Sequence, residues 1–418
     1  MRRPGGIDRE VLLFKSGDAC IMGVTTRSGR RCAVADLMDY LDWRGDLTFS
    51  QSPFNEVDNL ILAELSFVDL RGIAPGVGGG AGVPLRAAAE RYFAAGRDKT
   101  LESSVLVPEQ IPAMLEKMCR SARFGGLRVS CCEERLDEAR EEQFAALAVE
   151  LPDRTVYLSF RGTDDTLVGW KEDFNMALRD EVPSQLRAVD YVKRAAAQYE
   201  GWRLYLGGHS KGGNLAVYSA VNCGAAIQDR ILAVYNNDGP GFRKTLLSRE
   251  EHRRIADRIF TILPKSSVVG LLMEHEESFT VVDSTQVGIL QHDGFSWCVL
   301  GPRFVRMDDL TGVETNDRSI REWVDSLDQT QRQQFTDALF EVLSASGATT
   351  LAELREQGVK SAAAMLKAMA GLDKETRKAL DCAVGVLFIK SGAQSLLDDW
   401  KRESAKRRRK KAQRKEEP

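Results

Sequence analysis

A serine flanked by glycines lies near the centre of this chain. Residues 208–212 read Gly-His-Ser-Lys-Gly and fit the pattern G-x-S-x-G, in which a sharp turn between a strand and a helix exposes the serine hydroxyl. Glycine is needed on both sides of the turn because a Cβ atom there would collide with the neighbouring strand or helix. An apolar run at 202–206 precedes the turn, and small residues follow from Gly212 onward. The sequence therefore predicts Ser210 as a nucleophile on a strand–turn–helix unit.

A serine nucleophile needs a base to take its proton, and the chain has only four histidines. His209 directly precedes the serine, so its side chain should point away from it, and we interpret it as structural. His252 lies in a charged stretch and is expected to face solvent, whereas His275 is a weaker candidate near the end of a helix. His292 lies in a polar loop late in the chain, which suits the order Ser–Asp–His of α/β-hydrolases. His292 is therefore the predicted base.

The acid that would orient this base is less clearly marked. Asp238 follows an apolar run at 231–236 and so lies at the carboxyl end of a predicted strand, where the sites of open α/β sheets gather. The same residue could simply cap the turn formed by residues 239–241. Asp283 and Asp293 are alternatives, although Asp293 directly follows the predicted base in the sequence. We take Asp238 as the predicted acid.

Two backbone N–H groups are expected to stabilise the oxyanion of an acyl-transfer intermediate. The first belongs to Lys211, the residue after the nucleophile. The second is expected from Thr163, where Gly162 permits a tight turn and the threonine offers both an N–H and a hydroxyl. The charge of the Lys211 side chain could favour an anionic substrate or could form an ion pair with a nearby acid.

These residues need a sheet to position them, and the sequence predicts one. Short apolar runs alternate with helical patterns, which indicates the α/β class with a mostly parallel sheet covered by helices on both faces. Antiparallel pairing is expected among the first strands and among the last ones. The expected strands span 127–132, 144–150, 155–160, 202–206, 231–236, 258–263, 278–282 and 295–300, and the main expected helices span 184–199 and 212–226.

Helical patterns flank this core on both sides. Apolar residues recur with a helical period at 54–68, and a capping box at 319–322 opens another helix. The glycine-rich segment 75–84 is expected to be a connector, because no strand precedes it and no GK[ST] follows. The expected regions are an N-terminal extension at 1–34 that could be disordered, a helical region at 35–120, an α/β-hydrolase core at 121–301, a second helical region at 302–399, and a basic disordered tail at 400–418.

The composition is that of an ordinary globular protein, with 43% hydrophobic and 28% charged residues and a formal net charge of -3. No run approaches the ~18 apolar residues of a membrane span, and no signal peptide is recognisable. The cysteines lack the spacing of zinc sites and are expected to be free thiols. We therefore expect a cytoplasmic protein without cofactor or metal. The basic tail could contact an anionic membrane surface, and no specific nucleic-acid binding is expected.

Six stretches of the chain resemble the Mbeg1-like family, a bacterial family in the lipase class 3 branch of the α/β-hydrolase superfamily. The most specific stretch is 159–174, which reads Ser-Phe-Arg-Gly-Thr-Asp-Asp-Thr-Leu-Val-Gly-Trp-Lys-Glu-Asp-Phe. The other stretches are 38–46, 54–67, 207–216, 237–241 and 291–293. The resemblance extends over residues 35–390 and implies a lipase-like serine hydrolase core with the nucleophile, base and oxyanion donors named above.

One segment departs from this pattern. Class 3 lipases carry their acid in an Asp-x-Val-Pro-like segment after a late strand, whereas the corresponding segment here, 263–270, has serines where the carboxylate should stand. Either Asp238 supplies the acid from the end of the preceding strand, or the triad is incomplete. A triad without its acid loses several orders of magnitude in rate but keeps some activity.

Two functional hypotheses follow. The first is a serine hydrolase that cleaves carboxylic esters, with lipid acyl esters as the substrate class, through an acyl-enzyme on Ser210, His292 and Asp238. The second is a catalytically weak or inactive α/β-hydrolase-fold module with a binding or regulatory role, favoured by the missing late carboxylate and by the large helical flanks. A peptidase or thioesterase on the same triad stays open.

Overall fold

The computed structural model describes the central part of the chain and a few short segments outside it. The described residues are 14–16, 19–21, 35–101, 107–267, 269–270, 273–275, 277–308, 329–357 and 359–369. The first two segments are the strands β1 (Phe14–Ser16) and β2 (Ala19–Ile21), which pair antiparallel. The predictions for the rest of the N-terminal extension, for the capping box at 319–322 and for the basic tail lie outside the described residues.

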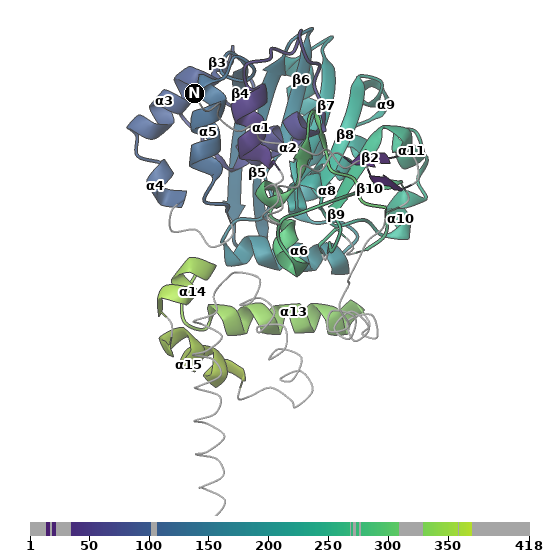
Figure 1. Cartoon of the computed structure of the whole chain (residues 1–418). Helices are drawn as coiled ribbons and strands as arrows, with labels where there is room; N and C mark the ends of the chain where they lie inside the picture. Colours follow the sequence, from purple (N-terminus) through teal and green to yellow (C-terminus); the bar gives the residue numbers. More distant parts are fainter. Residues whose placement is uncertain are drawn as a thin grey trace, which may run out of the picture.

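An eight-stranded sheet forms the centre of the molecule, with the strands in the order β10-β9-β8-β7-β6-β5-β4-β3 (Figure 1). The strands from β6 to β10 run parallel to one another, and those from β3 to β6 pair antiparallel. The predicted mostly parallel sheet with antiparallel first strands is therefore confirmed. Their bounds are β3 (Val83–Pro84), β4 (Arg128–Asp137), β5 (Glu142–Leu151), β6 (Thr155–Phe160), β7 (Arg203–His209), β8 (Ile231–Asn237), β9 (Ile259–Pro264) and β10 (Phe279–Val282).

The last expected strand, 295–300, is only partly correct. The structure has a short 3-10 helix, η4 (Gly294–Ser296), followed by β11 (Val299–Leu300), which pairs with β12 (Arg303–Phe304) outside the main sheet. The side chain of Asp293 accepts a hydrogen bond from the N–H of Phe295, and this local turn competes with strand formation. Phe295 and the apolar residues 297–299 are buried in the core, whereas Leu300 is exposed, and this buried run explains why the segment resembles a strand.

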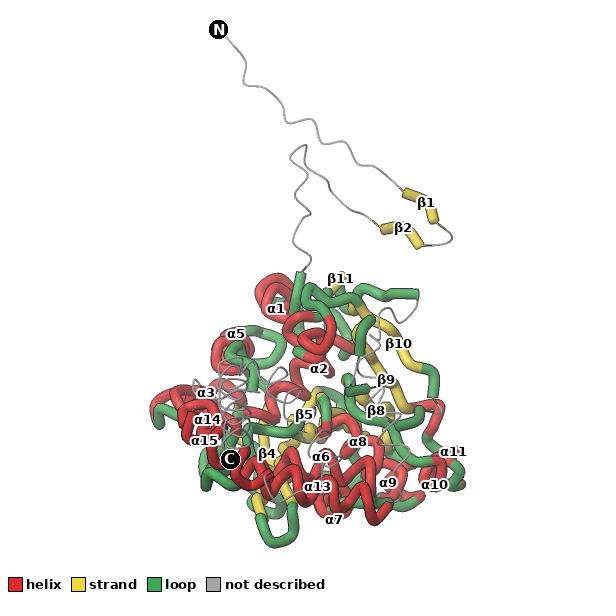
Figure 2. Tube along the Cα trace, turned by 90° about the horizontal axis from the view of Figure 1, so that it is seen from below, coloured by secondary structure: helices red, strands yellow, loops and turns green. Residues whose placement is uncertain are grey.

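Helices cover both faces of the sheet, as Figures 1 and 2 show. The helices that cover one face, or that follow such a helix in the chain, are α1 (Leu37–Arg44), α2 (Glu56–Glu64), η1 (Leu65–Phe67), α3 (Leu85–Ala94), α4 (Asp98–Leu101) and α5 (Ile111–Arg120). Those on the other face, or at its edge, are α7 (Pro183–Gln198), α8 (Lys211–Asn222), α9 (Ala225–Gln228), α10 (Lys244–Leu247), α11 (Glu250–Arg253) and η2 (Ala256–Arg258). The prediction of a sheet covered on both faces is confirmed.

The alternation of side chains along the strands separates two hydrophobic clusters. In β5, Leu147 and Val149 pack among α1, α2, α3 and α5, whereas Ala148 between them packs against the α7 and α8 side. The adjacent Cys131 and Cys132 likewise belong to different clusters, as expected for neighbours on a strand. Both faces of the sheet are therefore buried, which is why its strands read as nearly continuous apolar runs.

A third cluster lies below the carboxyl ends of the parallel strands in Figure 1, where α6 (Leu167–Leu178) meets α13 (Gln329–Ser344), α14 (Leu351–Gln357) and α15 (Val359–Ala368). Leu339 and Leu343 of α13 are fully buried there and belong to the same cluster as Leu167. Two backbone hydrogen bonds join the segments: Leu167 N–H donates to Thr349 O, and Leu351 N–H donates to Asp165 O, each at 2.9 Å. The C-terminal helices are thus tied to the start of α6.

Candidate active site

Ser210 occupies a strained turn between β7 and α8. Its backbone has φ 57° and ψ -131°, a combination that residues with a side chain rarely adopt. The Ser210 N–H donates to Asn237 O, and the Gly213 N–H donates to Ser210 O, both at 2.9 Å. These hydrogen bonds hold the turn between the end of β8 and the first turn of α8. The predicted strand–turn–helix arrangement around Ser210 is present.

The glycines of this turn have no room for a side chain. A Cβ atom on Gly208 would lie 2.3 Å from the carbonyl carbon of Gly212, and one on Gly212 would lie 2.1 Å from Phe160 O. In the loop after β6, a Cβ atom on Gly162 would lie 3.3 Å from the Cβ atom of Ser210. The elbow and the loop that carries Thr163 therefore pack directly against each other.

His292, at the end of η3 (Gly288–His292), is paired with Asp238. Its Nδ1 lies 2.7 Å from Asp238 Oδ2, and the Asp238 side chain is fully buried. A carboxylate can only accept, so Nδ1 carries the hydrogen and Nε2 is left free to accept a proton. Among the described residues, Ser210 Oγ and His292 form no hydrogen bond to each other. Such contacts are often long before substrate binds.

The serine segment after β9 orients this carboxylate. Ser267 Oγ donates to Asp238 Oδ1, and the N–H of Gly270 lies 3.2 Å from the same oxygen. The Asp238 N–H itself donates to Ile262 O at 2.9 Å. The segment 263–270, in which serines stand where class 3 lipases carry their acid, thus supplies hydrogen-bond donors to an acid that comes from the preceding strand.

The other two candidate acids have different partners. Asp283 Oδ1 lies 2.5 Å from Lys265 Nζ, and Asp293 Oδ1 accepts the N–H of Phe295 at 3.0 Å. Burial raises the pKa of Asp293. In the described part of the chain, the carboxylate that reaches the His292 ring is therefore that of Asp238.

The remaining histidines are all largely buried. The prediction that His252 faces solvent is wrong: its side chain is fully buried, because α11 packs it inward together with Ile255 while the charged residues between them point outward. His275 Nδ1 lies 3.1 Å from Glu277 Oε1, and its Nε2 lies 2.6 Å from Gly270 O. Burial lowers the pKa of His275, but the hydrogen bond and charge of Glu277, the carbonyl of Gly270 and the charge of Asp238 together outweigh it, so the net shift is upward.

The side chain of Lys211 turns away from the elbow and is buried. Its Nζ donates to Gln143 O at 2.8 Å and lies 3.2 Å from Glu172 Oε2; it also contacts Gln143 Oε1. Of the two alternatives for this lysine, the structure shows the ion pair with a nearby acid. The Lys211 side chain is 1% exposed, so its charge does not face a substrate. The backbone N–H of Lys211, at the first position of α8, remains the group suited to an oxyanion.

Thr163 is held by a second carboxylate of α6. Its Oγ1 donates to Asp173 Oδ2 at 2.5 Å. Burial raises the pKa of Asp173 to about 6, against the opposing effect of Lys211. Because the hydroxyl is engaged in this way, the backbone N–H of Thr163 is the group left to face a substrate oxygen.

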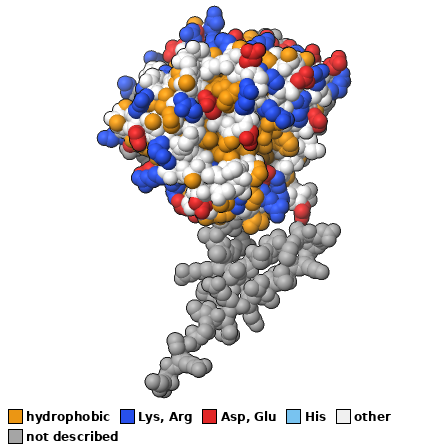
Figure 3. All heavy atoms as spheres, turned by 90° about the horizontal axis from the view of Figure 1, so that it is seen from above, with side chains coloured by type: hydrophobic (Ala, Val, Ile, Leu, Met, Phe, Trp, Pro, Cys, Tyr) orange, Lys and Arg blue, Asp and Glu red, His pale blue; other side chains and the backbone are white. Residues whose placement is uncertain are grey.

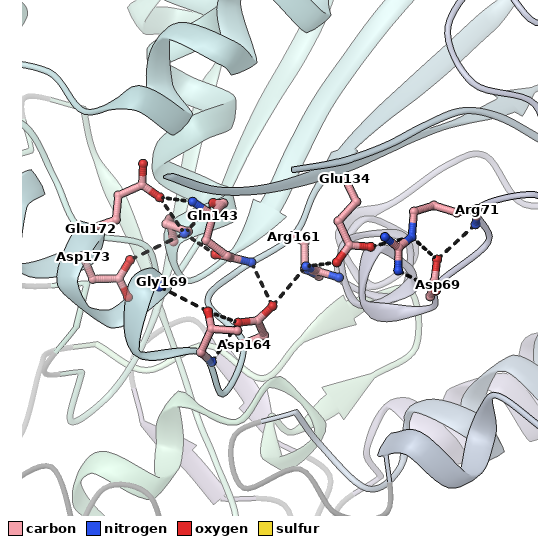
Figure 4. Close-up of polar contacts among 11 residues, drawn as sticks. Asp69, Arg71, Glu134, Gln143, Arg161, Asp164, Gly169, Glu172 and Asp173 are labelled. Atoms are coloured by element: carbon pink, nitrogen blue, oxygen red, sulfur yellow. Dashed lines mark hydrogen bonds and ion pairs between the residues drawn. The ribbon is translucent and has the colours of Figure 1, made fainter. Parts of the chain in front are cut away.

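Figure 4 shows the polar contacts continuing from α6 to the far side of the Thr163 loop. Asp164 Oδ2 lies 3.1 Å from Arg161 and 3.2 Å from Gln143 Nε2. Arg161 also contacts Glu134 at 2.9 Å, and Glu134 lies 2.9 Å from Arg71. Alternating charges therefore hold the loop that follows β6 from both sides.

Polar residues of α2 brace the other side of the elbow. The hydroxyl of Tyr157 donates to Asn59 Oδ1 at 2.7 Å, and Asn59 Nδ2 donates to Asn237 Oδ1 at 2.8 Å. Asn237 Nδ2 in turn donates to Gly208 O at 3.0 Å. Sequence reasoning missed these residues. The signal available to it was a polar pair inside an otherwise apolar helix, which does not reveal its partners.

Within the described ranges, no group of three or more His, Cys, Asp or Glu side chains is arranged to hold a metal ion. None of the described helices is long and apolar enough to cross a membrane. On the face seen from above in Figure 3, opposite to the view of Figure 2, basic and acidic side chains are interspersed with hydrophobic ones.

No curated protein matches the chain. Similar solved structures include Lip2 lipase from Yarrowia lipolytica (13% identity, 40% of this chain and 69% of that chain covered, TM-score 0.29). Others are a mutant form of MDLA from Penicillium cyclopium (13%, 60% and 84%, 0.35) and a Rhizomucor miehei lipase propeptide complex (14%, 50% and 71%, 0.30). The Mbeg1-like family model matches residues 118–341, more than half of the sequence, and the chain thus belongs to the Mbeg1-like family.

Proposed function

We propose that this protein is a serine hydrolase that cleaves carboxylic esters, with lipid acyl esters as the substrate class, through an acyl-enzyme. One observation carries the proposal: the strained elbow of Ser210 lies at the same sheet edge as a histidine whose Nδ1 is 2.7 Å from Asp238. The resemblance of the segments around Thr163 and Ser210 to class 3 lipases supports an ester as substrate. The cytoplasmic location and the contact of the basic tail with an anionic membrane stay predictions.

The chemistry proceeds in two halves. Ser210 Oγ forms a bond to the ester carbonyl carbon while His292 Nε2 takes the hydroxyl proton, and the carbonyl electron pair moves onto oxygen. The N–H groups of Thr163 and Lys211 stabilise this oxyanion. The imidazolium then gives its proton to the departing alcohol. In the second half, water repeats the attack on the acyl-serine with His292 as base, which releases the carboxylic acid and restores Ser210.

A fluorophosphonate probe tests this proposal, because it reacts only with an activated serine. We expect the wild type to be labelled and to hydrolyse p-nitrophenyl esters, and Ser210→Ala to do neither. Asp238→Asn should lower kcat by about 10⁴-fold, since the wrong imidazole tautomer then faces the serine. Asp283→Asn is the matched control, because Asp283 contacts Lys265 and should leave kcat unchanged.

A binding or regulatory module is the second candidate, favoured by the lack of a hydrogen bond between Ser210 Oγ and His292 among the described residues. Equal labelling of the wild type and Ser210→Ala, with no ester turned over across short and long acyl chains, would refute the hydrolase proposal and support the module.

A further inference from the structure

Behind the His292 loop, Glu64 and His209 form a buried pair that the proposed reaction does not use directly. Glu64 is the last residue of α2, and His209 is the last residue of β7. His209 Nδ1 lies 3.1 Å from Glu64 Oε1, and the two side chains are 7% and 0% exposed. The other ring nitrogen, Nε2, lies 2.7 Å from the backbone carbonyl oxygen of His292. The pair therefore connects α2 to the backbone of the predicted base.

The partners of the His209 ring determine where its hydrogen lies. A carbonyl oxygen can only accept, so Nε2 must carry the hydrogen that it shares with His292 O. Burial, together with a smaller effect of the neighbouring His292, lowers the pKa of His209 to about 3. The ring is consequently neutral, and its Nδ1 is an acceptor.

Glu64 must then act as a donor. Neither of its carboxyl oxygens has a hydrogen-bond partner among the described residues, and His209 Nδ1 approaches only to 3.1 Å, so an ionised Glu64 would be a buried charge without compensation. Burial raises the pKa of Glu64 well above its ordinary value, and Asp293 adds to the effect. As a neutral acid, Glu64 has one O–H, and the acceptor within reach is His209 Nδ1.

A neutral His209 also suits the reaction electrostatically. The rings of His209 and His292 lie with their centroids 4.7 Å apart. His292 becomes positively charged when it takes the serine proton, and a second imidazolium at this distance would oppose that charge. A neutral ring held by Glu64 supports the His292 backbone without this repulsion.

We infer that Glu64, as a protonated carboxylic acid, donates a hydrogen bond to His209 Nδ1 and so holds the ring with its Nε2–H on His292 O, and that both are positioning residues for His292. This inference rests on the proposed function. Without the Glu64 donor, His209 Nδ1 is a buried acceptor without a partner, and the ring is no longer held in the orientation that hydrogen-bonds to His292 O. Neither residue touches the reacting atoms.

A second anchor keeps the loop folded when this one is lost. Trp297 Nε1 donates to Gln291 O at 2.8 Å, and Gln291 Oε1 accepts the N–H of Ser266 at 3.1 Å. Loss of the His209 hydrogen bond should therefore shift the His292 ring rather than unfold the loop. A shift of about 1 Å in a catalytic group costs on the order of 100-fold in rate.

Two substitutions at Glu64 test the inference. Glu64→Gln keeps an N–H donor at the same place, and we expect kcat within about threefold of the wild type. Glu64→Leu keeps the volume and removes the donor, so kcat should fall by about 10- to 100-fold with KM unchanged. With four histidines in the chain, NMR of the ring nitrogens can resolve His209, whose Nε2–H should be protected from solvent exchange in the wild type and Glu64→Gln and should exchange faster in Glu64→Leu.

Asp58→Asn provides the matched control. Asp58 lies on the same helix and forms a buried ion pair with Arg123, so its loss should reduce stability and leave kcat unchanged. A Glu64→Gln variant as slow as Glu64→Leu would overturn the inference, because it would show that Glu64 acts as a charge. A Glu64→Leu variant with wild-type kcat and wild-type protection of the His209 Nε2–H would also overturn it. The Ser210→Ala variant tests the hydrolase proposal alone, so a failure of that proposal can be distinguished from a failure of this inference.

Discussion

The hydroxyl of Thr163 has a single hydrogen to donate, and Asp173 Oδ2 accepts it in a hydrogen bond of 2.5 Å. In the same way, the Lys211 ammonium is occupied by Gln143 and Glu172 rather than directed at a substrate. At both predicted oxyanion positions, therefore, the side chain is committed to the protein and the backbone N–H remains for the substrate. The side chains set the positions of these N–H groups.

Thr163→Val should lower kcat by about tenfold, less than the 10²–10³-fold expected for loss of an oxyanion donor itself. The substitution removes the hydrogen bond to Asp173 and keeps the backbone N–H. Thr163→Ser and Asp173→Asn both preserve a donor and acceptor pair, so each should stay close to the wild type. Steady-state ester hydrolysis provides the measurement. A Thr163→Val enzyme with wild-type kcat would show that the hydroxyl has no part in placing the loop.

At the scale of elements, the neighbouring strands β8 and β9 together position the carboxylate of Asp238. The end of β8 carries Asp238, and the segment after β9 donates hydrogen bonds to it from Ser267 and Gly270. The same Gly270 offers its carbonyl to His275, which is paired with Glu277 before β10. Burial raises the pKa of Glu277, but hydrogen bonds from His275 and Thr261 bring it down to about 2.

Glu277→Gln should lower the free energy of unfolding by about 3 kcal/mol near pH 5.5, because it leaves a buried histidine charge without its partner. The pKa of Glu277 is depressed, so its contribution is present above pH 4.5 and is lost as the pH falls toward 2. The pKa of His275 is raised, so its contribution is present below pH 6.5 and is lost as the pH rises through that raised pKa. Urea unfolding from acid to alkaline pH measures both limits.

The control for this substitution is Glu274→Gln, because Glu274 is exposed and pairs with the equally exposed Lys244 at 3.4 Å. It should change stability little at any pH. A difference between wild type and Glu277→Gln that stays constant from about pH 3 to pH 8 would contradict a charged His275–Glu277 pair.

At the scale of the whole molecule, the described residues form three hydrophobic clusters rather than one. Two lie on the opposite faces of the sheet, and the third joins α6 to the C-terminal helices. This third cluster adjoins the Thr163 loop through the backbone hydrogen bonds between 165–167 and 349–351. The C-terminal helices are therefore placed to stabilise the loop that would carry the second oxyanion donor. The division of the chain into regions stays a prediction.

Leu339→Ala should lower the free energy of unfolding of this third cluster by about 2–5 kcal/mol, because Leu339 is fully buried there. Hydrogen exchange should then speed up in α13 and α15 while α7 keeps its protection. Ester hydrolysis should fall with it, since residues 165–167 lose their hydrogen-bonded partner segment at 349–351. Equal loss of protection across the whole molecule would contradict an independent C-terminal cluster.

The sequence by itself determined the features that depend on neighbours along the chain. Ser210, its flanking glycines, the strand before it and the helix after it lie within about twenty residues, so their pattern predicts the turn. The alternation of apolar runs and helices likewise predicts a mostly parallel sheet. His292 could be predicted as the base because the chain has few histidines, and Asp238 could be predicted as the acid because it follows a strand.

Only the tertiary structure decided which of these groups meet. Glu64 contacts His209, and Thr261 donates a hydrogen bond to Glu277. The two residues of each pair are separated in the sequence, and no local spacing encodes such a contact. The burial of His252 also depends on the helix against which it packs, which its charged neighbours conceal. The carboxylate that meets His292 follows β8, because the parallel order of the sheet brings the end of β8 beside the serines after β9, where hydrogen bonds stabilise a buried carboxylate.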